Sequence, residues 1–472
     1  MFETVQIPVW LISIVALLAA VSALERILVP SVRWFFRRRM ERVVARLNER
    51  LERPIEPFKL ARRHDMIQRL IYDPKVAEAV AEQAKEDGIP ENVAFEAAHR
   101  YAREIVPSFS ATAYFGFATR ITRWLSRGIY RVRIAYRDEK SIAEIEPSST
   151  VVYVMNHRSN MDYFLVTYLA AERTALSYAV GEWARVWPLQ GLLRFMGAYF
   201  IRRKSNNVLY RRVLGRYVQM ATEAGVGQAV FPEGGLSLTG EVKPPKLGIL
   251  NYVISGYHGD EGRDVVFVPV ALNYDRVLED RVLIEAATAG GRKFRFGPFS
   301  MLGFVFRQIR FFLTGRFHRF GYAAVSFGSP LSLREFSKDM DVRSSEELTK
   351  NVGRELMARV RQEVPVLPVP LVAYILCRAQ EPLAREEVEA QLVQIVEKLR
   401  DCSAQVHLPR DNTNYATQVG LRMLLLRQFI REDDSGMIIN EKSRDLVEYY
   451  AKSIAHIVDA EIDERGDRPE LK

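Results

Sequence analysis

Two residues that could do acid–base chemistry, His157 and Asp162, stand five positions apart. They follow the uncharged, β-branched run 151–155, which has the composition of a buried strand. Histidine titrates near neutral pH, and a nearby carboxylate can orient its ring, so such a pair could remove a proton from an alcohol. The sequence therefore predicts a general base where a strand ends.

The spacing restricts how these two side chains can meet. Five residues along a continuous helix turn the chain by about 500°, which would place the side chains on different faces. They meet only if His157 lies in a loop and a helix begins between them. Ser159 is a suitable N-cap for that helix, with Asp162 three residues later, as in a capping box. The alternative is structural: Asp162 only caps the helix, and His157 is an ordinary loop residue.

Other predicted strands also end in polar groups suited to a phosphorylated alcohol. These groups are Arg202, Arg203 and Lys204 after the run 197–201, Glu233, Gly234, Gly235 and Ser237 after the run 229–231, and then Lys243 and Lys246. The planar fork of arginine matches phosphate oxygens, and glycines let backbone N–H groups approach a ligand. Each segment by itself also fits an ordinary turn. A further run, 267–272, indicates a buried strand with Pro269 at an edge or bulge.

Taken in order, these segments resemble the glycerol-3-phosphate acyltransferase family within the wider glycerolipid acyltransferases. The His–Asp pair matches the family's block of His, four residues and Asp. Residues 197–203 match its Gly-x-Phe-Phe-Ile-Arg-Arg block, residues 231–240 match most of its Phe-x-Glu-Gly-Gly-Arg-Ser-Arg-Thr-Gly block, and residues 268–270 match its Val-Pro-Val strand. One block would be weak evidence, but four in order are strong. The looser likeness extends over about residues 100–430.

The resemblance implies a role for each matched position. His157 would act as general base on the sn-1 hydroxyl of glycerol 3-phosphate, Asp162 would hold the imidazole, and the hydroxyl oxygen would attack an acyl thioester directly. The residues expected to bind substrate are Arg158, Ser159, Arg202, Arg203, Glu233, Gly234, Gly235, Ser237 and Lys246. We expect no metal and no cofactor, with acyl-CoA or acyl carrier protein as the thioester co-substrate.

The third block departs from the family pattern. Leu236 and Leu238 stand where the family usually has arginine, so two candidate phosphate-binding guanidiniums are missing. Lys243, Lys246 or Arg158 would have to compensate. The departure leaves the acceptor open, and lysophosphatidate is the alternative to glycerol 3-phosphate. It also motivates a different class of function, a non-catalytic membrane scaffold of the same fold.

Composition limits the remaining classes of function. The 472-residue chain is 48% hydrophobic and 26% charged, which is typical of a globular protein of more than one domain. Its net charge of +9 favours an anionic partner, but no nucleic-acid-binding motif accompanies it, so we expect no nucleic acid. Two cysteines are too few for a disulfide framework or a zinc cluster. GxSxG, Walker A, HExxH and complete GxGxxG motifs are all absent from the sequence.

The N-terminus has the composition of a membrane segment. Residues 7–24 carry no charge, and at about 1.5 Å per residue they would cover about 27 Å of a thin hydrocarbon core. Eight arginines follow between positions 26 and 50, which by the positive-inside rule places the remaining chain in the cytoplasm. We therefore expect a single-pass anchor in the cell membrane, facing an anionic lipid surface. A helix lying on that surface is the alternative.

The texture of the sequence divides the chain into four regions. We expect a transmembrane anchor over 1–32, a basic juxtamembrane and helical region over 33–125, an α/β domain over 126–340, and a C-terminal helical region over 341–472. Strand-like runs at 151–155, 198–201, 228–231, 265–272 and 323–327 predict a central mixed or largely parallel sheet flanked by helices. The stretch 292–317 interleaves cations with aromatic residues, which suits anionic lipid or, alternatively, a buried aromatic helix.

Overall fold

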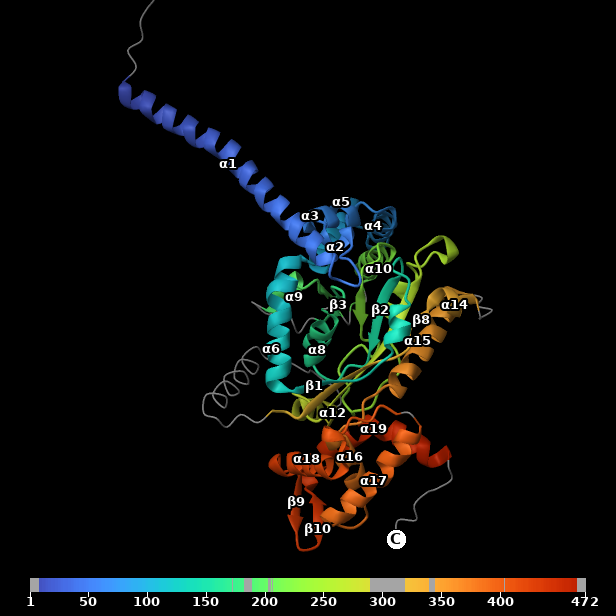
Figure 1. Cartoon of the computed structure of the whole chain (residues 1–472). Helices are drawn as coiled ribbons and strands as arrows, with labels where there is room; N and C mark the ends of the chain where they lie inside the picture. The colour runs from blue at the N-terminus through green and yellow to red at the C-terminus, as the bar shows by residue number, and fades with distance from the viewer. Residues whose placement is uncertain are drawn as a thin grey trace, which may run out of the picture. The chain divides into compact units, whose positions relative to one another are not determined.

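The computed structural model describes residues 8–171, 173–181, 189–202, 205, 207–288, 319–338, 344–402 and 404–464. Two compact units result, one formed by residues 1–55 with 172–174 and the other by residues 56–171 with 175–472. The first unit contains the long helix α1 (Val9–Asn48), and the second contains the sheet and the other elements (Figure 1). The predicted lipid-facing stretch 292–317 lies outside the described residues.

Helix α1 corrects the expected membrane segment. The helix begins at Val9, and its uncharged part ends at Leu24, because Glu25 and Arg26 follow within the same helix. These sixteen residues cover about 24 Å, less than the hydrocarbon core of about 30 Å. Within the ranges given above, no helix combines the length and the apolar content that crossing a membrane requires. The prediction of a transmembrane helix within residues 1–32 is therefore not supported.

The second unit is built on an eight-stranded sheet. Its order is β1 (Arg131–Arg137), β7 (Tyr322–Phe327), β6 (Val265–Tyr274), β2 (Thr150–Met155), β5 (Gln228–Val230), β3 (Ser177–Val180) and β4 (Tyr199–Phe200), and β8 (Leu331–Ser332) also pairs with β6. β6 is antiparallel to β7 and β8, and the other pairs are parallel. The predicted α/β fold with a mixed, largely parallel sheet is confirmed.

The central strands owe their position to continuous apolar sequence. Every residue of β2 and of β6 is buried, which is the pattern of strands covered on both faces. Pro269 lies inside β6 and not at the predicted edge or bulge. It falls between Phe267, the last residue that pairs with β8, and Val270, the first that pairs with β7. The missing proline N–H is therefore tolerated where β6 changes its partner.

The strand directions bring four chain segments to one edge of the sheet. β2 and β6 are parallel, so Met155 and Tyr274 end at the same edge. β7 is antiparallel to β6 and begins there at Tyr322, and β1 is parallel to β7 and begins there at Arg131. Loops that follow β2 and β6, and residues that open β7 and β1, therefore meet along one edge.

Helices pack around this sheet and extend the unit at both ends. The principal ones are α3 (Arg63–Ile71), α4 (Pro74–Asp87), α5 (Glu91–Ile105), α6 (Thr119–Ile129), α8 (Met161–Ala170), α10 (Val208–Glu223), α15 (Ser345–Gln362), α16 (Pro368–Arg378), α17 (Arg385–Asp401), α18 (Thr413–Leu426) and α19 (Arg444–Glu464). Shorter ones are α2 (Pro57–Leu60), η1 (Ala113–Ala118), α7 (Glu139–Ala143), α9 (Leu189–Phe195), α11 (Gly248–Ile254), η3 (Gly259–Glu261), α12 (Asp280–Thr288), α14 (Leu333–Lys338), η4 (Pro409–Asp411) and η5 (Glu441–Ser443).

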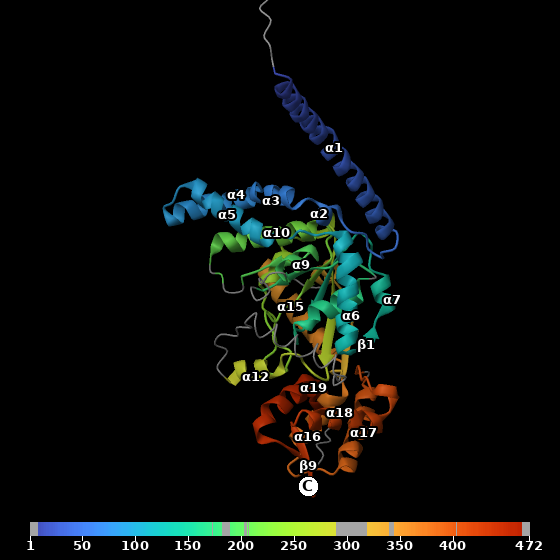
Figure 2. The same cartoon turned by 90° about the vertical axis from the view of Figure 1, so that its left-hand side faces the viewer.

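Two groups of helices lie beside the α/β core. Helices α4 and α5 pack on α10, and both views show these helices side by side (Figure 1 and Figure 2). Helices α16 to α19 form the C-terminal group together with the hairpin β9 (Ile430–Asp433) and β10 (Gly436–Ile439), and α19 contacts α12 and α15. Both groups belong to the same compact unit as the sheet. The four region boundaries expected from the sequence stay predictions.

Candidate active site

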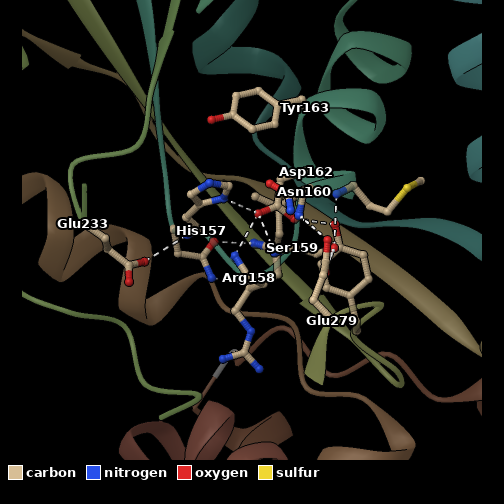
Figure 3. A network of polar contacts seen from close by, with 12 residues as sticks. His157, Arg158, Ser159, Asn160, Asp162, Tyr163, Glu233 and Glu279 are labelled. Carbon is tan, nitrogen blue, oxygen red and sulfur yellow. Dashed lines mark hydrogen bonds and ion pairs between the residues drawn. The ribbon is translucent and has the colours of Figure 1, made fainter. Parts of the chain in front are cut away.

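The predicted His–Asp pair forms where β2 ends. His157 lies two residues beyond Met155, the last residue of β2, and Asp162 lies in the first turn of α8. The imidazole Nδ1 lies 2.9 Å from Asp162 Oδ2, and a dashed line marks this contact in Figure 3. Because a carboxylate only accepts hydrogen bonds, Nδ1–H donates to it and Nε2 is the basic nitrogen of the ring. The predicted meeting of these two side chains is confirmed.

The helix that carries Asp162 begins slightly later than the sequence indicated. α8 starts at Met161, with Asn160 at the N-cap position and no side-chain cap bond. Ser159, the predicted N-cap, instead accepts a hydrogen bond from the Met161 N–H through Oγ over 3.1 Å. Asp162 Oδ2 accepts from the N–H groups of Arg158 (2.8 Å) and Ser159 (3.0 Å), which closes a tight turn before the helix. The carboxylate therefore both organises this turn and contacts the imidazole.

Strand β6 supplies a further partner of the carboxylate. Tyr274 donates its Oη–H to Asp162 Oδ1 over 2.5 Å, and both side chains are 0% exposed. Burial first, and then the charge of Asp162, hold the pKa of Tyr274 well above its ordinary value, so the hydroxyl keeps its proton. Donors on both oxygens fix the orientation of the carboxylate and, through it, of the imidazole.

The imidazole ring is held between two aromatic side chains. Its centroid lies 4.2 Å from that of Phe231 at an interplanar angle of 31°, and 5.4 Å from that of Tyr163, which it meets edge to face. His157 is 1% exposed. The low dielectric of this buried position strengthens the contact between the ring and the carboxylate.

The glycine-rich loop holds the backbone of His157 from both sides. Glu233 Oε1 accepts a hydrogen bond from the His157 N–H over 2.9 Å, and the Ser237 N–H donates to the His157 carbonyl over 2.9 Å. Gly234 has φ 70°, a left-handed backbone conformation that favours glycine at this turn. Gly235, half-buried, follows in the same turn.

Glu233 is a buried carboxyl with two backbone partners. Its second oxygen, Oε2, accepts from the Lys243 N–H over 3.4 Å. Burial raises the pKa of Glu233 to about 7, although both hydrogen bonds and the charges of Arg158 and Lys243 favour the ionised form. The sequence predicted a contact with the acceptor hydroxyl, whereas the structure shows Glu233 bonded to the backbone of His157.

The Arg158 side chain extends away from the His157 ring (Figure 3). Its guanidinium donates to the Gly240 carbonyl and, over 3.3 Å, to Asn273 Oδ1, and it lies 5.1 Å from the ring centroid of Tyr449. The residue is 2% exposed. Arg158 thus ties the glycine-rich loop to β6 and to α19, and its predicted contact with substrate stays a prediction.

Ser159 contacts a glutamate that the sequence did not point to. Its hydroxyl donates to Glu279 Oε2 over 2.7 Å, and the Asn160 N–H donates to Glu279 Oε1 over 3.1 Å (Figure 3). Burial raises the pKa of Glu279 to about 7, against the effect of these two hydrogen bonds. Glu279 thereby fastens the turn between His157 and Asp162 to the start of α12.

The second basic block is only partly described. Arg202 forms a two-pronged ion pair with Glu104 of α5, with Nη2 to Oε2 at 2.7 Å and Nε to Oε1 at 2.9 Å, and it lies over the rings of Tyr101 and Tyr210. Arg203 lies outside the described residues. Lys246 is exposed beside Gly234. The structure therefore gathers Arg158, Ser159, Glu233 and Ser237 around His157, and it shows Arg202 paired with Glu104.

Sequence reasoning missed three polar residues at this edge of the sheet. Tyr274 and Glu279 contact the turn directly, and Asn156 exchanges two hydrogen bonds with the backbone of Leu272, at 2.9 and 2.8 Å. The rule that polar groups at strand ends gather at one edge could have found Tyr274, because it ends the apolar run of β6. Among the described residues, no cluster of three or more His, Cys, Asp or Glu side chains could hold a metal ion.

Comparison with known proteins agrees with the resemblance that the four sequence blocks indicated. The family described as Acyltransferase matches residues 133–273, and the family described as Glycerol-3-phosphate acyltransferase C-terminal region matches residues 306–459. A curated glycerol-3-phosphate acyltransferase of Pseudomonas fluorescens (strain SBW25) is 29% identical over 421 residues, which is 84% of this chain and 48% of that protein. One of Aeromonas hydrophila is 28% identical over 417 residues, 84% of this chain and 50% of that protein.

This chain spans about half the length of the curated relatives that it matches. The solved 1-acyl-sn-glycerophosphate acyltransferase of Thermotoga maritima is 18% identical, with a TM-score of 0.30, over 52% of this chain and 79% of that one. The two family matches include the His–Asp turn, the glycine-rich loop, β6 and the C-terminal helices up to residue 459. The resemblance to glycerol-3-phosphate acyltransferases that the sequence blocks predicted is confirmed over these matched residues.

Proposed function

We propose that this protein transfers a fatty acyl group from a thioester to the sn-1 hydroxyl of glycerol 3-phosphate, the first step of phospholipid synthesis. The observation that carries the proposal is the contact of His157 Nδ1 with Asp162 Oδ2 at 2.9 Å. The other carboxylate oxygen, Oδ1, accepts a hydrogen bond from Tyr274. This arrangement leaves Nε2 as the proton acceptor. The names of the curated relatives support glycerol 3-phosphate as acceptor.

The proposed reaction needs no acyl-enzyme. The acceptor hydroxyl gives its proton to His157 Nε2 while its oxygen forms a bond to the thioester carbonyl carbon. The tetrahedral intermediate then collapses, the carbon–sulfur bond breaks, and the imidazolium returns the proton to the departing thiolate. Asp162 stabilises the imidazolium between these two steps. General base catalysis of this kind contributes about 10²–10⁴ in rate.

The identity of the acceptor depends on charges outside the His–Asp pair. Leu236 and Leu238, where the family usually has arginine, are both half-buried. These apolar side chains favour lysophosphatidate as the alternative acceptor, because its acyl chain adds apolar surface. The cations proposed for the phosphate are Arg202, Arg203, Lys243 and Lys246.

The donor and the place of action are also proposed. The donor is acyl-CoA or an acyl carrier protein, and the enzyme works at the cytoplasmic face of an anionic cell membrane. Support comes from α1, where Trp10, Leu17 and Leu18 are 63%, 64% and 62% exposed and arginines follow in the same helix. Exposed apolar side chains next to basic ones suit attachment to anionic lipid.

An acceptor panel with purified full-length protein tests the function. Glycerol 3-phosphate, dihydroxyacetone phosphate and lysophosphatidate are each offered with one labelled thioester. We expect saturable transfer to glycerol 3-phosphate, which His157→Ala reduces by about 10²–10⁴. His258→Ala is the matched control, because His258 is exposed and pairs with Glu223, outside the site. Full activity of His157→Ala would reject the mechanism, and transfer to lysophosphatidate alone would reject the acceptor.

A further inference from the structure

A cationic cavity lies at the sheet edge where β1 and β7 begin. Its volume is about 280 Å³, and its lining includes Arg131, Arg133, Tyr322, His407, Arg410 and Tyr415. No lining residue is acidic, and none belongs to the turn or loop around His157. A concentration of cations and phenolic hydroxyls around a partly open cavity is the chemistry of an anion site.

The sheet register places two of the arginines together. Arg131 and Arg133 stand two residues apart on β1, so they project from the same face, and Arg131 is opposite Tyr322 of β7. Their guanidinium carbons lie 5.6 and 5.8 Å from the Tyr322 ring centroid, and Arg131 Nη1 donates to Tyr322 Oη over 3.5 Å. Charged residues on an edge strand also block unwanted strand pairing. That role does not account for the residues that the C-terminal group adds opposite them.

The C-terminal group contributes a third arginine from a strained turn. Arg410 and Asp411 both have positive φ, 58° and 51°, in the turn Pro409–Asp411. Consecutive left-handed residues other than glycine are unfavourable and often mark binding sites. The Arg410 guanidinium lies 4.5 Å from the ring centroid of Tyr415, and Asp411 is paired with Arg400, which does not line the cavity. The turn therefore presents its cation to the cavity while its carboxylate is neutralised elsewhere.

His407 supplies a buried polar atom in the same lining. Its Nε2 has no hydrogen-bond partner among the described residues, and its ring packs edge to face on Tyr322 with 5.4 Å between centroids. Burial, and then the charge of Arg133, lower the pKa of His407, so the ring is neutral at neutral pH. A buried nitrogen without a partner is unfavourable, and a bound oxyanion would accept a hydrogen bond from it.

We propose that this cavity binds a phosphate monoester group at a site separate from the acceptor site at His157. Three guanidiniums, two phenols and an imidazole match the oxygens of a phosphate dianion. The volume of about 280 Å³ is below the usual range of about 300–1,000 Å³ for sites that enclose a whole small molecule. The cavity therefore holds the phosphate and a small attached body, and not an acyl chain. The phosphate comes from a soluble phosphorylated compound or from a lipid headgroup.

Two substitutions on separate elements test the site in the full-length protein. Arg133→Gln removes a cation of β1. Among the described hydrogen bonds, the Arg133 guanidinium donates only to the carbonyl of Val132. Arg410→Asn removes the cation of the turn and keeps a residue that tolerates left-handed backbone. Arg422→Gln, an exposed position on α18 outside this lining, is the control matched in charge. Thermal unfolding of each variant verifies that it folds.

Isothermal titration calorimetry at about 50 mM salt measures binding of inorganic phosphate and pyrophosphate as soluble ligands. Flotation with vesicles that contain phosphatidic acid measures binding to a lipid headgroup. We expect Arg133→Gln and Arg410→Asn each to weaken binding about ten- to a hundredfold in at least one of these measurements, and Arg422→Gln to change it less than about twofold. An effect in the titration identifies a soluble ligand, and an effect confined to vesicles identifies a headgroup. The proposal would be overturned if the soluble phosphates and the vesicles both bind, and neither variant weakens this binding more than the control does.

Discussion

Removal of one hydroxyl group tests whether the orientation of the general base depends on β6. Tyr274→Phe deletes the donor that lies 2.5 Å from Asp162 Oδ1 and leaves the aromatic ring in place. Because both residues are 0% exposed, water does not replace the lost hydrogen bond. A hydrogen bond to a charged group contributes about 1.5–3 kcal/mol. The donors on Oδ2 remain, so we expect the fold to persist and the carboxylate to lose its fixed orientation.

The expected effect is on the chemical step. If the lost free energy appears in the transition state, kcat falls about ten- to a hundredfold, while KM for the acceptor changes less than about twofold. Initial rates with a labelled thioester and varied glycerol 3-phosphate separate the two constants. Tyr178→Phe is the matched control, since it removes a buried hydroxyl that bonds to Thr167 at 2.6 Å and not to Asp162.

Two results would refute the reasoning. One is a kcat of Tyr274→Phe within about twofold of that of the unmutated protein. The other is an equal loss in Tyr178→Phe, which would mean that any buried hydroxyl deletion slows the enzyme through general loosening of the structure. Thermal unfolding of both variants, measured in the same buffer, separates loss of stability from loss of catalysis.

Two further predictions concern stability. Burial raises the pKa of Glu279 from 4.5 to about 7, so the folded protein binds this proton more tightly than the unfolded chain does. As the pH rises from about 4.5 to 7, this group should therefore lower the free energy of unfolding by about 1.4 kcal/mol per pH unit. Denaturant melts across that range should show a shallower dependence in Glu279→Gln, and an unchanged slope would contradict the assignment. Gly240→Ala should lower the unfolding free energy by about 3 kcal/mol or more, because φ is 91° and the new Cβ would overlap the Tyr449 carbonyl. Gly88→Ala, with φ 63° and open space around it, should cost only about 1 kcal/mol, and equal losses in the two variants would disprove the overlap.

Local sequence patterns predicted much of the α/β core. The runs 151–155 and 265–272 became β2 and β6 almost residue for residue, because buried central strands have continuous apolar sequence. The run 323–327 became β7. Strand β1 was not predicted, because it is an edge strand whose arginines interrupt the apolar pattern. Strand β3 (Ser177–Val180) was also not predicted, because Ser177 and Ala179 are not typical strand residues.

The apolar N-terminal run shows where local composition misled. Counting uncharged residues from Ile7 gave eighteen, but the helix begins at Val9, and charged residues follow Leu24 within the same helix. Helix length, which the count did not measure, decides whether an apolar segment reaches across a bilayer. Exposed apolar side chains on α1 remain, and they support surface attachment as a proposal.

The sequence by itself indicated that His157 and Asp162 could meet, because a helix that starts between them can bring the two side chains together, and it left open a purely capping role for Asp162. Only the tertiary structure decided what holds them. Tyr274 lies 112 residues from Asp162, and Glu279 lies 120 residues from Ser159. They reach the site because β6 pairs in parallel beside β2, and that pairing depends on long-range burial of both strands, which spacing along the chain does not encode. The parallel pairing of β5 with β2 likewise brings Glu233 and Ser237, in the loop after β5, to the backbone of His157.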